Sequence, residues 1–213
     1  MELSAFLGAH VVSVDDFSWP GVAPTIARMP VPLEFYSERL HLRRMAAEHL
    51  PDLIELDADP EVMRHISGGL PNSRERYESE LLPRMLAWDE QPFGFLAAYE
   101  AGRFQGWFHL RPSVADSSVL ELGYRLRRAA WGRGLATEGA RVLLAHAFDR
   151  LGQSAVDACT HPDNSASMRV MLKCGMRRVG TFMHPRIPLE VVRFMIERDE
   201  WASTTVLAAP HNS

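Results

Sequence analysis

Alternating apolar and polar residues, and apolar residues at helical spacing, follow one another along the chain from residue 38 onward. The alternation, together with turn residues such as Ala101-Gly102, predicts strands over 38–43, 93–100, 103–111, 119–126, 155–160, 176–182 and 189–197. Helical spacing predicts helices over 48–57, 59–65, 74–88, 135–151 and 164–173. This order predicts an α/β (α+β) fold, with a mixed sheet flanked by helices in a single domain.

Three of these elements carry local detail. Asn164 is expected to cap its helix and Gly175 to close it, and Pro83 should bend or shorten the helix over 74–88. The strand over 119–126 has two chemically different faces. One face presents Leu120, Leu122, Tyr124 and Leu126, and the other presents Glu121, Gly123 and Arg125.

The ends of the chain differ from its middle. Residues 1–38 contain Pro20, Pro24, Pro30 and Pro32, which break any long element, so we expect an irregular N-terminal arm with at most one short strand or helix. This arm packs on its own domain, exchanges with a partner chain in a homodimer, or is simply an extended start. The domain proper is expected over 39–201, with a C-terminal tail over 202–213.

Composition excludes several classes of function. The 213 residues are 46% hydrophobic and 23% charged, and the net charge of −4 provides no global basic field for nucleic acid. No apolar run approaches the roughly 20 residues that cross a bilayer, and the first 27 residues lack the Lys or Arg of a secretory signal. We therefore expect a cytoplasmic protein without membrane or nucleic-acid partners. No cluster of His, Cys and carboxylates suggests a metal.

A glycine-containing turn joins the strand over 119–126 to the next helix. Gly132 and Gly134 let a ligand approach the backbone, and the N–H groups that open the helix favour an anion. Arg127, Arg128 and Arg133 are placed to add positive charge. The turn indicates a phosphate-bearing ligand, although a tight turn that uses glycine only for its shape remains an alternative. Gly-Lys-Ser/Thr is absent, and Thr137 stands where a dinucleotide fingerprint has its third Gly.

Four segments together resemble the GNAT superfamily of N-acetyltransferases, over about residues 39 to 201. They are Glu121-Leu-Gly-Tyr-Arg-Leu, Ala130-Trp-Gly-Arg-Gly-Leu-Ala-Thr-Glu, His161-Pro-Asp-Asn-Ser-Ala-Ser and Lys173-Cys-Gly-Met. The chain is most similar to the branch that acetylates ribosomal-protein N-termini. The resemblance implies a GNAT-like, mostly antiparallel sheet and acetyl-coenzyme A (acetyl-CoA) as donor.

The resemblance also implies where the donor binds. The family's pyrophosphate motif falls on Trp131 to Ala136, and the pantetheine arm is expected to bond main-chain groups near Leu126 like an extra strand. Glu138 is expected to be structural. The implied donor-binding residues are Leu126, Arg127, Arg128, Trp131, Gly132, Arg133, Gly134, Leu135, Ala136, Thr137, Asn164, Ser167 and Lys173.

Acetyl transfer to an amine needs a base and an acid. Glu121 is the candidate base, because it lies on the strand expected to line the donor. Its alternative role is an ion pair, with Arg125 as the expected partner. Many family members carry a Tyr acid seven positions after the Asn, but this chain has Met171 there. Ser167 or solvent then protonates the thiolate, or it leaves unaided.

Asn164 and Ser167 have a simpler interpretation, as a helix cap with a first-turn serine. His161, at a strand end, and Glu190, in the last strand pair, are further candidates for contacting the acceptor substrate.

The sequence thus predicts an acetyl-CoA-dependent N-acetyltransferase that acts on a primary amine by direct attack. A protein N-terminus and a small-molecule amine are both open as acceptors, and the branch resemblance favours the former. Two alternatives remain: a catalytically silent acyl-CoA-binding sensor or partner module, and a nucleotide-binding protein that uses the same turn.

Overall fold

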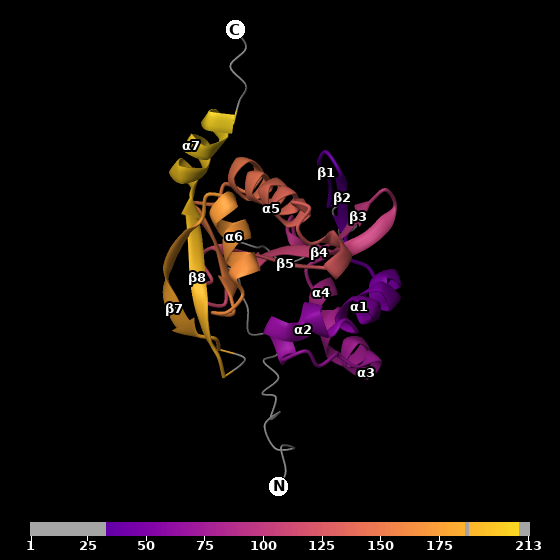
Figure 1. Ribbon diagram of the computed structural model, residues 1–213. Helices are drawn as coiled ribbons and strands as arrows, with labels where there is room; N and C mark the ends of the chain where they lie inside the picture. Colours follow the sequence, from indigo (N-terminus) through magenta and orange to yellow (C-terminus); the bar gives the residue numbers. More distant parts are fainter. Residues whose placement is uncertain (1–32, 186–187, 209–213) are drawn as a thin grey trace.

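The fold is built on one eight-stranded mixed sheet, within the residues that the computed structural model describes, 33–185 and 188–208 (Figure 1). The strand order is β1-β2-β3-β4-β5-β6-β8-β7, and the β5–β6 pair alone is parallel. This confirms the predicted fold class. The strands are β1 (Glu34–Tyr36), β2 (Leu40–Arg44), β3 (Gly94–Glu100), β4 (Arg103–Pro112), β5 (Leu120–Leu126), β6 (Ala155–Thr160), β7 (Arg177–Met183) and β8 (Glu190–Glu197).

Helices cover both faces of the sheet (Figure 1). One face carries α1 (Leu50–Asp57), α2 (Pro60–Ser67), α3 (Arg74–Arg76) and α4 (Leu82–Leu86), and the other carries α5 (Leu135–Ala145) and α6 (Ser165–Lys173). Each side has its own apolar core: Leu53, Leu56 and Trp107 belong to the first, Leu135 and Phe108 to the second. Among the described helices, none combines the length and apolar composition that a membrane span requires.

The parallel pair β5–β6 is short, and this shortness shapes the rest of the molecule. Only Leu120 pairs with Val156 and Glu121 with Asp157, although both strands continue beyond these residues. From residue 122 onward, β5 is therefore paired with β4 on one edge and has no strand partner on the β6 side. The main-chain N–H and C=O groups on this edge therefore have no partner in a neighbouring strand. Polar backbone groups inside a protein need hydrogen-bond partners, which a ligand can supply.

The helix predicted over 74–88 is divided into three parts. A π-helical turn, η3 (Tyr77–Leu81), separates α3 from α4, and the N–H of Leu82 donates to the carbonyl of Tyr77, five residues back. Pro83 lacks an N–H group and disfavours regular α-helix before it, so the chain widens one turn ahead of the proline. The predicted bend is thus a π-bulge, and the helix ends at Leu86.

Both ends of the domain have structure beyond the predicted limits. The strand β1 lies within the segment expected to be an arm and pairs with β2. The helix α7 (Arg198–Ala208) begins before residue 201 and continues into the expected tail. The predicted arm over residues 1–32 lies outside the described residues. The caps are as predicted: Asn164 accepts from the N–H of Ser167 at 3.0 Å, and Gly175 has φ +84°.

Gly139 makes possible the close packing of α5 on the sheet. A Cβ atom at this position would lie 2.7 Å from Cε1 of the fully buried Phe108. Gly139→Ala should therefore destabilise the fold by about 1–3 kcal/mol through overpacking, although alanine gains about 1 kcal/mol of helix propensity. Urea unfolding measures the change. The double variant Gly139→Ala/Phe108→Leu should lose less than the sum of the single variants, and a Gly139→Ala protein as stable as wild type would contradict this packing.

Candidate functional site

The turn between β5 and α5 presents free N–H groups to one side of the sheet. Gly134 caps α5 with φ +84°, and Gly132 has φ +71°, in the left-handed region that residues with a Cβ rarely adopt. The N–H of Glu138 already donates to the carbonyl of Gly134, whereas the N–H groups of the preceding three residues of α5 precede the first helical bond. These donors and the helix dipole favour an anion at the start of α5.

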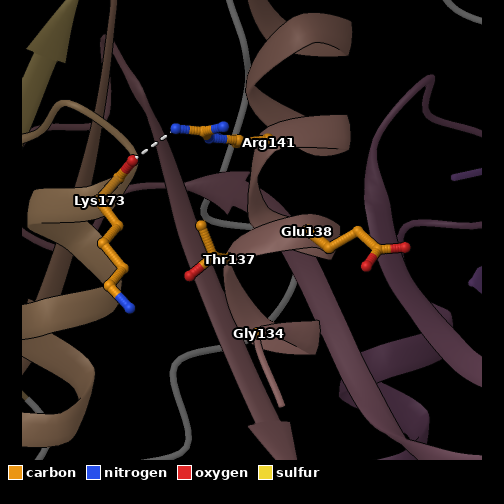
Figure 2. Close-up of a pocket in the computed structure, with 5 residues that line it drawn as sticks. All are labelled: Gly134, Thr137, Glu138, Arg141 and Lys173. Carbon is orange, nitrogen blue, oxygen red and sulfur yellow. Dashed lines mark hydrogen bonds between the residues drawn. The ribbon is translucent and has the colours of Figure 1, made fainter. Parts of the chain in front are cut away.

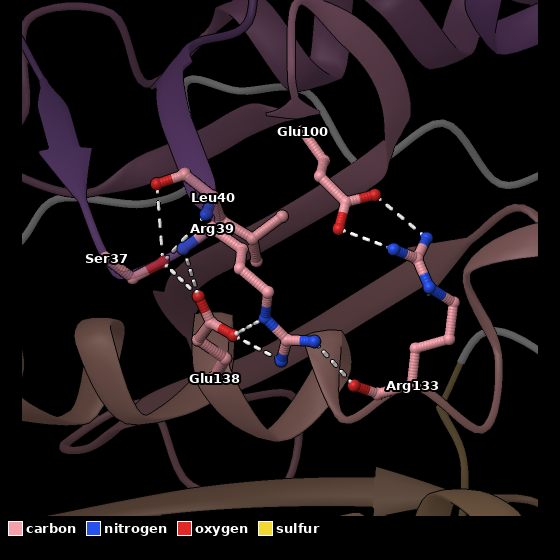
Figure 3. Close-up of polar contacts among 6 residues, drawn as sticks. All are labelled: Ser37, Arg39, Leu40, Glu100, Arg133 and Glu138. Carbon is pink, nitrogen blue, oxygen red and sulfur yellow. Dashed lines mark hydrogen bonds and ion pairs between the residues drawn. The ribbon is translucent and has the colours of Figure 1, made fainter.

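A polar network from the far edge of the sheet fixes this turn (Figure 3). Glu138 accepts from Ser37 Oγ at 2.7 Å and from the Arg39 backbone N at 2.8 Å, and it forms an ion pair with the Arg39 guanidinium. Arg39 Nη1 also donates to the carbonyl of Arg133 at 2.8 Å. Arg133 itself makes two bonds, of 2.8 and 2.6 Å, to Glu100. These contacts support the structural role expected of Glu138.

A pocket of about 380 Å³ lies beside the turn, in the angle between α5 and α6 (Figure 2). Its lining residues are Gly134, Thr137, Glu138, Arg141 and Lys173. Arg141 Nη2 donates to the carbonyl of Lys173 at 2.9 Å, and the Glu138 carboxylate points away from both cations. Neither cation has a carboxylate partner in the part of the chain that the structure describes. The pocket therefore offers two positive charges next to the free N–H groups.

Arg141 was not among the residues predicted for this site, whereas three other arginines were. Arg127 pairs with Asp52 and Glu55, Arg128 pairs with Asp59, and Arg133 pairs with Glu100. Their charges are thus partly neutralised within the protein. The position of Arg141, one helical turn after Thr137, is the signal that would have identified it. Trp131 is 46% exposed and donates from Nε1 to the carbonyl of Leu126 at 2.9 Å, which fastens the turn to the end of β5.

The unpaired edge of β5 has Tyr124 on its α6 side. The Tyr124 hydroxyl lies 3.0 Å from Ser167 Oγ, in the first turn of α6. Burial raises the pKa of Tyr124 well above its ordinary value, so the phenol keeps its proton at neutral pH. Tyr124 was missed as a polar candidate because it shares its face with Leu122 and Leu126, and a tyrosine in such a row is usually part of the core. The cap of Asn164 and the phenol of Tyr124 together orient Ser167.

Glu121 lies on the opposite face of β5 and is buried in an ion pair. Its Oε1 accepts from Arg111 Nη2 at 2.6 Å, and its exposed fraction is 5%. Burial opposes ionisation, but the neighbouring His109 ring and the charge of Arg111 lower the pKa of Glu121 to about 2. The partner expected from the sequence, Arg125, was wrong. Residues 121 and 125 lie four positions apart in an extended strand, too far for their side chains to pair. Arg125 instead forms an ion pair with Asp57 of α1 at 2.5 Å.

His109 of β4 lies against the backbone of β5. It is the cross-strand neighbour of Gly123, and a Cβ atom at residue 123 would lie 2.6 Å from its Nε2. The same Nε2 is 3.4 Å from Glu121 Oε1, without hydrogen-bond geometry, and neither ring nitrogen has a hydrogen-bond partner among the described residues. No local pattern pointed to His109, because its place beside Glu121 depends on the β4–β5 register.

A second buried carboxylate, Asp157, is the parallel-strand neighbour of Glu121. It accepts from Ser113 Oγ at 2.7 Å and from Arg193 Nε at 2.8 Å. Burial outweighs these bonds and raises the pKa of Asp157 to about 6. Burial also raises the pKa of Cys159, two residues further along β6, to about 12. The Cys159 thiol therefore keeps its proton at neutral pH.

The two candidate acceptor contacts lie in different surroundings. His161 follows β6, and its ring centroid is 5.3 Å from that of His65 in α2, so the loop before α6 meets the helices on the Glu121 side. Glu190 is exposed at the start of β8 and accepts from Thr181 at 2.7 Å. His161 thus lies next to α2, whereas Glu190 lies at the exposed start of β8.

The chain matches the family model described as "Acetyltransferase (GNAT) domain" over residues 39–177. It is 33% identical over 180 residues to an Aspergillus fumigatus protein named FsC-acetyl coenzyme A-N(2)-transacetylase, covering 78% of this chain and 77% of that protein. It is also 30% identical over 164 residues to the uncharacterized protein YkkB of Bacillus subtilis, covering 73% of this chain and 91% of YkkB.

Solved structures share the fold. A GNAT-family acetyltransferase from Bacillus anthracis superimposes with a TM-score of 0.65 at 22% identity, covering 78% of this chain and 99% of the other. The aminoglycoside acetyltransferase AAC(6')-Ib in complex with coenzyme A gives a TM-score of 0.67 at 20% identity, covering 78% and 99%.

The Glu121–Arg111 pair gives a pH-dependent stability test. Arg111→Met removes the main charge partner of a buried carboxylate and should cost about 3 kcal/mol at pH 7. The lowered pKa means that the interactions of Glu121 stabilise the wild type above its unfolded pKa, and that this contribution is lost as pH falls through about 2. In the variant the pKa of Glu121 rises, so the carboxyl protonates in mild acid and the penalty should shrink.

Urea unfolding of both proteins at pH 7 and at about pH 4 measures this difference. Arg111→Met/Glu121→Gln, which leaves no buried charge at either position, should recover much of the loss at pH 7. An equal penalty at both pH values would show that Glu121 is not the group left uncompensated.

Proposed function

The chain belongs to the GNAT acetyltransferase family, and from that premise we propose that it transfers the acetyl group of acetyl-CoA to a primary amine by direct attack. The observation that carries the proposal is the alignment of an anion site with an unpaired strand edge. The start of α5 offers N–H groups, Arg141 and Lys173 to a diphosphate. Directly before it, β5 offers main-chain groups from residue 122 to Leu126 to an extended arm.

The fit to the donor follows from the chemistry of these groups. Coenzyme A carries phosphates joined to a pantetheine arm with two amide bonds. Amides pair with a free strand edge as a strand does, and phosphates favour a helix start with neighbouring cations. We propose that Gly134, Ala136 and Thr137 contact the pyrophosphate. The arm then runs along β5 past Leu126 and Tyr124.

The reaction divides between the two faces of β5. The amine approaches on the face that carries Glu121, where a carboxylate assists its deprotonation. The carbon–sulfur bond of the thioester breaks as the carbon–nitrogen bond forms, and the leaving thiolate needs a proton. We propose that Ser167, oriented by Asn164 and Tyr124, supplies it in place of the tyrosine that Met171 replaces.

A small-molecule amine is the proposed acceptor. The Aspergillus relative is named for transfer to an N(2) nitrogen, and the AAC(6')-Ib structure is named for aminoglycosides. A protein N-terminus remains the second candidate, because the motifs of the chain resemble the ribosomal-protein branch. The domain limits, a cytoplasmic location and a homodimer stay predictions.

Release of free thiol from acetyl-CoA tests the function directly. The assay compares small-molecule polyamines and amino sugars with peptides that have free N-termini. Turnover with a small amine supports the proposal, and turnover confined to peptides would assign the second acceptor class. Calorimetric binding of coenzyme A without turnover on any amine would instead identify an acyl-CoA-binding sensor. Thermal stabilisation by ATP but not by coenzyme A would overturn the family activity.

The donor site is tested with one variant that changes its backbone and others that remove its charged side chains. Gly134→Asp should abolish coenzyme A binding, because it forces a side chain onto φ +84° and places a negative charge beside the pyrophosphate. Arg141→Ala and Lys173→Ala should each weaken binding about 5- to 20-fold and lower its salt dependence. Arg169→Ala, on the same helix as Lys173 but outside the pocket, is the matched control. Calorimetry showing equal affinities for Arg141→Ala and the control would place the phosphates elsewhere.

The proposed role of Ser167 as proton donor is tested by removing the hydroxyl groups of Ser167 and Tyr124 one at a time. Ser167→Ala should lower kcat about 10-fold or more and leave the Kd of coenzyme A nearly unchanged. Tyr124→Phe should lower kcat less, because the Ser167 hydroxyl remains but loses its partner at 3.0 Å. The Tyr124→Phe/Ser167→Ala double variant should be no slower than Ser167→Ala. Additive effects of the two changes would show that they do not act as a pair.

A further inference from the structure

Glu121 alone is a weak acceptor for the proton of an amine. The guanidinium of Arg111 at 2.6 Å and the neighbouring His109 hold the pKa of Glu121 at about 2. A general base works best when its pKa lies near the pH of the reaction. A carboxylate with so low a pKa can be protonated only transiently at neutral pH. The site therefore needs a second group to which the proton moves.

His109 is placed to be that group. Its imidazole lies between Glu121 and the unpaired part of β5, with Nε2 3.4 Å from Glu121 Oε1 and its ring against the Gly123 backbone. The ring is held by Trp107, stacked at a centroid distance of 5.7 Å, and by Phe95 at 4.8 Å. Buried polar atoms are normally hydrogen-bonded. The two ring nitrogens of His109, only 5% exposed and without hydrogen-bond partners among the described residues, are an exception that a functional role explains.

The surroundings keep this imidazole neutral until a proton arrives. Burial lowers the pKa of His109, and the positive charges of Arg111 and Arg125 add to this, while Glu121 opposes it. The titratable and charged groups around His109 and Glu121 are Arg111 of β4, Arg125 of β5, Asp57 of α1, which pairs with Arg125, and Asp157 and Cys159 of β6. The carboxylate of Glu121 is thus the negative group within ion-pair distance of the ring.

We propose, on the basis of the acetyl-transfer function above, that His109 is a positioning residue that stores the proton which Glu121 removes from the acceptor amine. The nitrogen of the amine forms its bond to the acetyl carbon and gives one proton to a Glu121 oxygen. Glu121 passes a proton to Nε2 of His109 and returns to the carboxylate form. The carbon–sulfur bond breaks, and the thiolate takes one proton from the Ser167 side. The imidazolium then releases its proton to solvent, and solvent restores the acid.

The small side chain at residue 123 is part of this arrangement. A methyl group there would occupy the position of the imidazole, since its carbon would lie 2.6 Å from Nε2. Gly123 therefore allows His109 to reach Glu121 across the pleat between two strands. The strand alternation that predicted the Glu121 face also places Gly123 on it.

The decisive variant is His109→Gln, which keeps a hydrogen-bonding group of similar size but cannot store a proton. In the wild type, log kcat should fall in acid, at a pH below the ordinary histidine pKa of about 6.5, as the imidazole becomes protonated before turnover. In His109→Gln this acidic decrease should disappear, and kcat at neutral pH should fall about 10- to 100-fold. The KM for acetyl-CoA should stay unchanged, because His109 lies outside the donor pocket.

His49→Gln is the matched control. His49 is also buried, with an Nε2 that has no hydrogen-bond partner among the described residues and a pKa lowered by burial, but it lies in the 3-10 turn η2 (Ala47–His49) before α1. This variant should keep the wild-type pH profile. A His109→Gln protein with wild-type kcat and pH dependence, or with a profile like that of His49→Gln, would overturn the proposal.

A measurement that needs no turnover tests the His109 proposal separately from the proposed acetyl-transfer function. The His109 Cε1–H resonance is followed by NMR against pH in the wild type and in Glu121→Gln. Removing the negative partner should move the transition to lower pH, and an unchanged transition would show that the two groups are not coupled. If the wild type neither binds coenzyme A nor releases thiol, the proposed function fails, and the NMR coupling still decides whether His109 and Glu121 form a unit.

Discussion

The central constraint in this molecule is the hydrogen bonding of one strand. The strand β5 is fully paired with β4, but it meets β6 only at residues 120 and 121. Backbone groups within a protein must find partners, so the remaining edge is stable only if an extended ligand or water satisfies it. The parallel pair thus does two things: it joins the two halves of the sheet, and by ending early it leaves the rest of β5 without a strand neighbour on that side.

Successive side chains of a strand point to opposite faces, and in β5 this alternation separates two groups of polar residues. Residues 121 and 123 face α1 to α4, whereas Tyr124 faces α6, so the proposed base and the proposed acid stand on opposite sides of one backbone. The Glu121 side is rich in charge, but each charge is held by a partner, such as Arg111 or Asp57. Buried ions are stable only when paired and hydrogen-bonded. The pairing therefore lets a polar face exist beside an apolar core.

Much of this arrangement was predictable from local patterns, and some was not. The strand periodicity identified β5, its two faces and the burial of the leucines, and turn chemistry located Gly134 at the start of α5. Local sequence could not identify the partner of Glu121, because Arg111 is ten residues away and meets it only through the β4–β5 register. It also missed Tyr124 and His109, since an aromatic residue among leucines and a histidine in a buried strand look like packing. Pro83 was recognised as a disturbance, but the π-helical turn depends on how the helix continues beyond it.

The contact between Arg39 and Glu138 joins residues 99 positions apart in the chain. Closing so long a loop costs conformational entropy before the contact returns any stability. The contacts that hold the start of α5 to residues 37–39 therefore exist only when the β1–β2 border of the sheet is in place. The shape of the turn that opens α5 thus depends on a strand pair at the border of the sheet, so a substitution at that border changes the turn without lying beside it in the chain.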